Sequence, residues 1–502
     1  MSRWQRIGSW AKSNSVPLLF AAGLAVRLVG LGDMFWYDES FTWNLARLPL
    51  DQMFAAIAAD VHPPLWYLLA WTVYHLGGTG EIALRLPALA FGLVDLALIY
   101  IIAGRLLGRP VAVATLAAAA CSPFLVYYSM EARMYSLLLT ALLLALLGGL
   151  TRRWWLFGLA AVAALYTHNL APISLAVVGL AVLAYHGRRA WWPLVWSTAV
   201  VGLLWVPGAA LAVSQMSQMS AGYWIMPPTP GGVIMNLNTL IFYFLPDVLQ
   251  PHAVLLSMIL LLAVSGVAVS QALRQPHERR GIVTALVLLA GPIVLLLAAS
   301  LVWRSVFLAR GLILAVVGLC LVSGYVWTQV GPRGRRLALV VLVPFLVLVL
   351  GSQYAPGRGR DGNDTLTMIR LIRENWQKGD MFYHLSSGSW VGMRFYMADL
   401  QPQYVFQQPG NLISSITDAE QAALGMPLVT SACSVKWDRL WLYDSRSYYV
   451  TAAEEAEANK LEGQYLTIAR WSFGEKQTLY LLDRSGLPVV GSPLTQQPVK
   501  RG

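Results

Sequence analysis

Two adjacent carboxylates, Asp38 and Glu39, lie in the stretch Trp36-Tyr37-Asp38-Glu39-Ser40, directly after the first apolar run of the chain. The first 353 residues contain only ten Asp or Glu residues, and six of these fall between Asp33 and Glu81. Carboxylates concentrated beside an apolar segment are typical of a reaction site or an ion-binding site at a membrane surface. The alternative is that one of the two acids caps the helix that follows.

Further polar residues recur in short stretches between the apolar runs. They are His62 before Pro63-Pro64, Tyr128, Glu131, Arg133 and Tyr135 in one stretch, His168 after Tyr166-Thr167, and the pair Arg304 and Arg310. Arginine offers a planar, permanently charged fork that suits phosphate, although an arginine at a membrane edge can also simply extend its side chain into the headgroups.

The elements that must position these residues are membrane helices. The chain has 502 residues, of which 57% are hydrophobic and 12% charged, with a mean hydropathy of +0.57. This composition indicates a polytopic membrane protein and excludes a soluble enzyme. Apolar runs of bilayer length lie near 16–32, 83–105, 110–126, 132–150, 154–168, 170–186, 191–213, 253–273, 281–301, 306–327 and 336–353.

A twelfth run, 62–77, is shorter than the ~20 residues that a span usually needs. Arginine clusters follow every second span, and all of them lie on the N-terminal side of the membrane only if 62–77 does not cross. We therefore predict eleven spans, a cytoplasmic N-terminus and an interfacial helix at 62–77. The outer face then carries the acidic loop 33–82, the loop 128–133, the loop 214–252 and the C-terminal tail.

The net charge of +11 is not a nucleic-acid signal. Residues 1–353 hold 21 Lys or Arg against 10 acids, whereas residues 354–502 hold 15 against 15, so the excess marks membrane topology. The three cysteines indicate no disulfide framework and no cysteine-based metal site. Because the outer loops lack His-x-x-x-His and Asp-x-Asp spacings, we expect no tightly bound metal, and a divalent cation stays an open alternative.

Three regions are expected: a transmembrane domain at 1–353, a soluble α/β domain at 354–490, and a disordered tail at 491–502. In the second region, helix-like stretches alternate with strand-like ones. The expected helices are Leu366–Gln377 and Ala452–Leu461, and the expected strands are Met381–His384, Leu440–Tyr443, Tyr465–Trp471 and Thr478–Leu482.

Taken in order and on one face, these motifs resemble the GT-C superfamily of glycosyltransferases that use polyprenyl-phosphate sugars. Within it, the chain is similar to the bacterial relatives of protein O-mannosyltransferases and of the lipid A aminoarabinose transferase. The resemblance covers about the first 350 residues, and each motif is weak alone. It implies a bacterial inner-membrane enzyme that inverts the anomeric centre as it transfers a sugar to a glycan, lipid or protein acceptor on the non-cytoplasmic face. A transporter or flippase of lipid-linked glycans is the alternative.

The resemblance also implies roles for the candidate residues. Asp38 is expected to be the base that deprotonates the acceptor hydroxyl, and Glu39 to orient Asp38 or hold the sugar. Arg310, with Arg304 as second candidate, is expected to bind the lipid phosphate, with Arg133 in support. Sugar or phosphate contacts are expected from His62, Glu131, Tyr128, Tyr135 and His168. Alternatives are an interfacial hydrogen bond for His62 and mutual pairing of Glu131 with Arg133.

Overall fold

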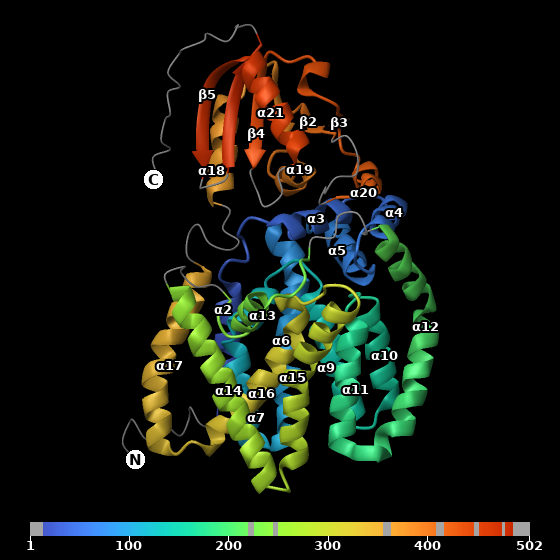
Figure 1. Ribbon diagram of the computed structural model, residues 1–502, viewed down its shortest axis with the longest axis vertical. Helices are drawn as coiled ribbons and strands as arrows, with labels where there is room; N and C mark the ends of the chain where they lie inside the picture. Colours follow the sequence, from blue (N-terminus) through green and yellow to red (C-terminus); the bar gives the residue numbers. More distant parts are fainter. Residues whose placement is uncertain are drawn as a thin grey trace.

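The protein is described by a computed structural model in which a helical bundle carries a smaller domain built on a β-sheet (Figure 1). The structure describes residues 14–218, 225–243, 249–354, 363–407, 416–445, 451–473 and 477–484. The predicted disordered tail, 491–502, lies outside these residues. The predicted fold class, a helical polytopic membrane protein with a C-terminal α/β domain, is confirmed.

Each of the eleven predicted spans coincides with helix. The helices at these positions are α2 (Ser15–Leu28), α6 (Glu81–Leu107), α7 (Arg109–Ala120) with α8 (Pro123–Tyr128), α9 (Tyr135–Leu150), α10 (Trp154–Leu165), α11 (Ala171–His186), α12 (Trp191–Gln218), α14 (Gln250–Arg274), α15 (Arg279–Val302), α16 (Ile313–Gln329) and α17 (Pro332–Gln353). Two 3₁₀ turns, η1 (Gly187–Ala190) and η4 (Ala309–Leu312), lead into α12 and α16. Among the described residues, six helical segments are long and apolar enough to cross a membrane. The count of eleven therefore stays a prediction.

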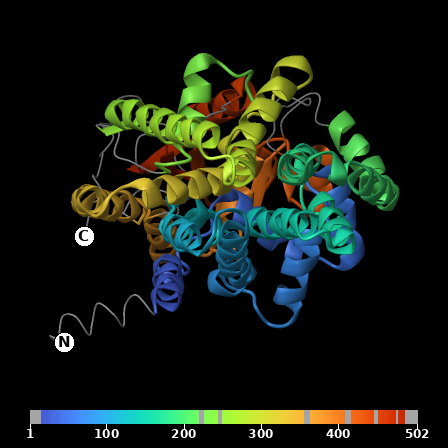
Figure 2. The ribbon, with the colours of Figure 1, turned by 90° about the horizontal axis from the view of Figure 1, so that it is seen from below.

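The outermost helices of the bundle present apolar side chains to their surroundings. In the view from below, α12, α14 and α17 lie at the periphery (Figure 2). Their exposed residues include Trp196, Leu262 and Val340. By contrast, α16 is mostly buried. Exposed tryptophan and aliphatic side chains on a peripheral helix fit contact with lipid.

Three short helices, α3 (Tyr37–Ala46), α4 (Leu50–Ala59) and α5 (Leu65–His75), lie between the bundle and the sheet domain (Figure 1). The predicted interfacial run 62–77 forms α5, which at 11 residues is too short to cross a bilayer. Pro64 precedes its first residue, and Gly77 follows its end with a φ of 96°, a value that glycine adopts readily. A further short helix, α13 (Pro230–Asn238), lies in the loop 214–252, where no helix was predicted.

The C-terminal domain is built on a six-stranded mixed sheet in the order β3-β2-β1-β4-β6-β5. Its strands are β1 (Asp380–His384), β2 (Gln403–Phe406), β3 (Leu428–Val429), β4 (Arg439–Ser445), β5 (Leu466–Phe473) and β6 (Gln477–Asp483). The first four strands run parallel, and β6 pairs antiparallel with both β4 and β5. Its helices are α18 (Asn363–Asn375), α19 (Ser387–Met393), α20 (Asp418–Ala423) and α21 (Ala452–Gln464), with a 3₁₀ turn η5 (Ala432–Ser434).

Alternate residues of the strands face opposite layers of this domain, as strand geometry requires. Phe382 and Trp441 pack with Ile369 and Ile372 of α18 on one face of the sheet. Neighbours such as Tyr383 pack with the α21 layer on the other face. The sheet is therefore covered on both sides, which is why every residue of its central strand β1 is buried.

The sheet domain is attached to the short helices by specific hydrogen bonds. The Tyr396 hydroxyl accepts a hydrogen bond from the Phe35 amide at 2.7 Å and donates one to Glu81 Oε1 at 2.9 Å. The Asn44 side chain on α3 donates to the carbonyl of Val391 on α19 at 3.2 Å. These bonds fix the chain on either side of the acidic pair.

Candidate active site

Asp38 lies in the first turn of α3, at the end of the bundle where the short helices meet the sheet domain. Its Oδ2 atom is 3.3 Å from Nη1 of Arg310 and 3.9 Å from Nε of Arg133. The Asp38 side chain keeps 18% of its surface exposed. The chain thus brings together a partly accessible carboxylate and two guanidinium groups that are 272 and 95 residues away in sequence.

Glu39 has a different environment, although it is the next residue. Its side chain is fully buried, and Arg85 holds both oxygens, with Nε at 2.8 Å from Oε1 and Nη2 at 2.6 Å from Oε2. The amide of Ala132 donates to Oε1 at 2.8 Å, and the amide of Trp36 donates to Oε2 at 3.4 Å. The last bond is the helix-capping contact that we gave as the alternative for this pair.

Arg85 extends this buried connection. Its guanidinium also donates to the carbonyls of Leu31, Asp33 and Met34, at 2.7, 2.6 and 3.2 Å. A planar guanidinium with five donors can satisfy a carboxylate and several carbonyls at once. The loop before α3 is therefore fixed to α6, and the backbone of Asp38 is fixed with it.

A second cluster adjoins Asp38 and is centred on Asp60. The Oδ2 atom of Asp60 accepts from the Tyr67 hydroxyl at 2.9 Å and lies 3.2 Å from Nδ1 of His62. Arg133 contacts the same group, with Nη1 at 3.2 Å from the Tyr67 oxygen and Nη2 at 3.3 Å from Nε2 of His62. Arg133 thus reaches both His62 and Asp38, and sequence reasoning did not identify Asp60 or Tyr67 as members of the site.

The charges around His62 determine its protonation. Burial lowers the pKa of His62 below its ordinary value, and the charge of Arg133 acts in the same direction, although Asp60 opposes both. Burial would raise the pKa of Asp60, but the contacts with His62 and Arg133 outweigh it and lower that pKa. A neutral imidazole can donate from Nδ1 to the Asp60 carboxylate and accept from Arg133 at Nε2, which satisfies every contact of the ring.

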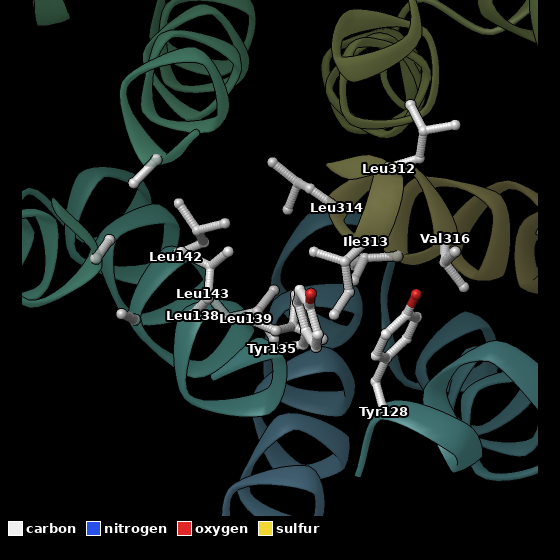
Figure 3. Packing of buried hydrophobic residues seen from close by; sticks show 14 of the residues in the cluster. Tyr128, Tyr135, Leu138, Leu139, Leu142, Leu143, Leu312, Ile313, Leu314 and Val316 are labelled. Atoms are coloured by element: carbon white, nitrogen blue, oxygen red, sulfur yellow. The ribbon is translucent and has the colours of Figure 1, made fainter. Parts of the chain in front are cut away.

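Arg310 is held on the other side of Asp38 by tyrosines. Its Nη1 donates to the Tyr135 hydroxyl at 3.2 Å, and the ring of Tyr135 packs against Tyr128 with centroids 4.7 Å apart. Figure 3 shows the two tyrosines side by side, next to the leucines of α9, with their hydroxyls directed to the same side. The Tyr243 hydroxyl donates to that of Tyr128 at 3.1 Å. These tyrosine hydroxyls give Arg310 polar neighbours among side chains that are otherwise apolar.

The remaining predicted residues lie at varying distances from Asp38. The fully buried Glu131 accepts a hydrogen bond from Nε1 of Trp36 at 2.9 Å. His168 packs edge-on against His62 and near Tyr135, with ring centroids 5.6 and 6.0 Å apart. Arg304 is half-buried, just after the end of α15, and its backbone amide donates to the carbonyl of Ala299 at 3.2 Å.

No group of three His, Cys, Asp or Glu side chains that could hold a metal occurs in the part of the chain that the structure describes. The expectation that no metal binds tightly stays a prediction, because a substrate phosphate can itself supply metal ligands.

Comparison with known proteins shows what part of the chain and what fold are similar to those of characterised proteins. Residues 61–214 match the model for the family described as dolichyl-phosphate-mannose-protein mannosyltransferase. The fold is similar to that of ArnT from Cupriavidus metallidurans bound to undecaprenyl phosphate, with a TM-score of 0.61, 14% identity, and coverage of 93% of this chain and 97% of ArnT. The predicted GT-C resemblance is confirmed.

The structure of ArnT from Cupriavidus metallidurans in the apo state is similar to this chain to the same degree. It gives a TM-score of 0.62 at 13% identity and covers 94% of this chain and 98% of ArnT. Comparison with curated protein sequences gives no significant match. The matched residues 61–214 include His62, Arg133 and His168, whereas Asp38 and Arg310 lie outside them.

Proposed function

We propose that this protein transfers a sugar from a polyprenyl-phosphate donor to an acceptor hydroxyl, with Asp38 as the catalytic base. The observation that carries the proposal is the meeting of one partly exposed carboxylate with Arg310 and Arg133. Support for the donor class comes from the mannosyltransferase family match and from the likeness to an ArnT structure that contains undecaprenyl phosphate. The sugar and the acceptor are left open.

The proposed reaction requires a base for the acceptor proton and cations for the negative charge of the departing phosphate. The acceptor oxygen attacks the anomeric carbon as its proton passes to Asp38, and the bond from that carbon to the phosphate oxygen breaks on the opposite side. The attack inverts the anomeric centre and leaves a lipid phosphate with added negative charge. Arg310 then stabilises this charge, since guanidinium forks bind phosphate oxygens in pairs.

Arg133 has a second role in this proposal. It lies between Asp38 and the cluster of Asp60, His62 and Tyr67, so it connects the base to a buried hydrogen-bond network. Its position favours orienting the Asp38 side chain, whereas Arg310 keeps more of its surface exposed, at 23%, for the phosphate. We assign Tyr135 to the orientation of Arg310, and Glu39 to the fixing of the helix turn that carries Asp38.

The proposed location is the inner membrane of a bacterium, with a cytoplasmic N-terminus and the active site on the periplasmic face. The arginine distribution between spans supports this orientation. We also propose that residues 354–490 act as an accessory domain whose contacts with α3 brace the site, above a transmembrane catalytic domain at 1–353.

A transfer assay tests the proposal. Purified protein in lipid nanodiscs is incubated with a panel of radiolabelled polyprenyl-phosphate sugars and a crude membrane extract as acceptor. We expect label from one donor to appear in an acceptor. If donors bind saturably to the purified protein yet no label is transferred with any extract, the enzyme assignment is wrong.

A further inference from the structure

A cationic pocket lies at the opposite end of α3 from Asp38. Its volume is about 480 Å³, and it opens between the α3–α4 connection and the sheet domain. Arg47, at the C-terminal cap of α3, and Arg394, which follows α19, line it from opposite sides. Within the described residues, its lining contains no acidic side chain.

Both guanidinium groups are held by aromatic rings. Arg47 lies over the ring of Trp43 at 5.6 Å from its centroid, and Arg394 lies over that of Trp390 at 4.1 Å. Such contacts occupy the flat face of a guanidinium and leave the N–H groups in its plane available. Two arginines are thus presented to one cavity in fixed positions.

The hydrogen-bond donors of this pair are only partly used. Arg394 donates from Nη1 to the carbonyl of Leu424 at 3.1 Å. The Nε atom of Arg47 is buried and has no hydrogen-bond partner in the described part of the protein. A buried donor left without an acceptor costs free energy, so a ligand with acceptor oxygens is favoured at this position.

The electrostatics favour the same kind of ligand. Burial, together with the charge of Arg47, lowers the pKa of Arg394 to about 9, and burial also lowers the pKa of Arg47. Neither arginine forms a salt bridge with an acid in the described ranges. An anion between the two groups would relieve both the desolvation and the mutual repulsion.

We propose that Arg47 and Arg394 bind a phosphate group of the acceptor substrate. The two positive charges match the two negative charges of a phosphate monoester. The assignment to the acceptor rests on the proposed transferase function. From Asp38 to Arg47 the chain advances nine residues along α3, about 13 Å at the helical rise, so an acceptor phosphate can be held while a distal hydroxyl reaches the base.

The anion site can be tested without transferase activity. The full-length protein in phosphatidylcholine nanodiscs is treated with phenylglyoxal, which modifies arginine, and modification is mapped by peptide mass spectrometry. Saturating inorganic pyrophosphate should slow modification of Arg47 and Arg394 by about tenfold. Modification of Arg373, an exposed arginine of the sheet domain that is paired with Asp399, should be unaffected. Equal rates at Arg47 and Arg394 with and without pyrophosphate would overturn the site.

Two further arms identify the source of the phosphate. In the transfer assay, Arg47→Gln with Arg394→Gln should raise the acceptor KM about 10- to 100-fold at unchanged donor affinity, and Arg373→Gln should change neither. An unchanged acceptor KM would reject the acceptor assignment even if transfer occurs. Protection of both arginines by phosphatidylglycerol nanodiscs alone would instead assign the pocket to a bilayer headgroup and overturn the proposal.

Discussion

At the scale of single residues, the two adjacent acids have separate environments because successive positions of a helix point about 100° apart. Asp38 faces Arg310 and Arg133 and is 18% exposed, whereas Glu39 points into the protein toward Arg85 and is fully buried. Asp38 was predicted to be the base, and Glu39 to orient Asp38 or hold the sugar. The structure favours chemistry for Asp38 and a positioning role for Glu39, because only Asp38 remains accessible to a substrate.

The lowered pKa of His62 predicts a pH-dependent stability. Because burial lowers this pKa in the folded protein, the unfolded chain binds a proton more readily. The contribution of neutral His62 is therefore present above the unfolded value of about 6.5 and is lost as the pH falls through and below it. We expect the thermal midpoint to fall between pH 7.5 and 5.5, and to fall less in His62→Gln. The exposed His75→Gln is the control, and equal slopes in His62→Gln and the wild type would contradict the prediction.

Arg310 gives a prediction on donor affinity. Arg310→Ala should weaken binding of the polyprenyl-phosphate sugar by about 10- to 100-fold, since a charge-assisted hydrogen bond to phosphate is lost. This affinity is measured as the binding of radiolabelled donor to nanodiscs that contain the protein. Arg304→Ala, the second candidate, should have a smaller effect because it is Arg310 that lies 3.3 Å from the Asp38 carboxylate. A larger loss in Arg304→Ala would exchange the two assignments.

At the scale of elements, the ion pair of Glu39 and Arg85 ties α3 to α6. Removing one partner leaves a buried charge without its counter-ion, so Arg85→Met should destabilise the protein by about 3–5 kcal/mol. The measurement is the thermal midpoint in detergent, which should be lower. Removing both charges with Glu39→Gln and Arg85→Met should cost less than the sum of the single changes. Additive losses would show that the pair does not act as a unit.

The helices were largely predictable because membrane spans are signalled by composition alone. The interfacial α5 was also predicted, since all arginine clusters lie on one side of the membrane only if residues 62–77 do not cross it. By contrast, α13 was missed because it is a helix of only 9 residues that begins with Pro230-Gly231-Gly232, residues that are typical of turns. The short strands β2 and β3 were missed for a related reason, as four and two residues show no alternation that can be recognised.

At the scale of the whole molecule, the site depends on contacts between segments far apart in sequence. Arg310 meets Asp38 from 272 residues away, and Tyr396 meets Phe35 from 361 residues away. The residue types at Asp38, His62, Arg133 and Arg310 were recognisable in the sequence. Asp60 lies two residues before His62 in an acid-rich stretch, so it could have been identified as a candidate site residue. Arg394, which lines the cationic pocket with Arg47, could not be recognised from the sequence, because no local sequence pattern links it to Arg47.

Docking of the sheet domain gives a prediction at this scale. Tyr396→Phe removes a hydroxyl that joins the Phe35 amide to Glu81, and it should weaken docking by about 1–3 kcal/mol. Hydrogen exchange should then quicken at residues 33–36, and transfer should slow because Asp38 follows this segment. The strands β4 and β6 serve as the internal control, since their exchange should be unchanged. Unaltered exchange at 33–36 would reject the bracing role of the domain.

The central claim is that Asp38 is the base of a glycosyl transfer, and Asp38→Asn tests it most directly. The amide keeps the size of the side chain but cannot take the proton from the acceptor. Sugar transfer and donor binding are measured side by side for the wild type and the variant in the same nanodiscs. The account predicts that transfer falls by at least about 100-fold while donor binding stays within a few-fold of wild type. Near-normal transfer by Asp38→Asn would contradict it.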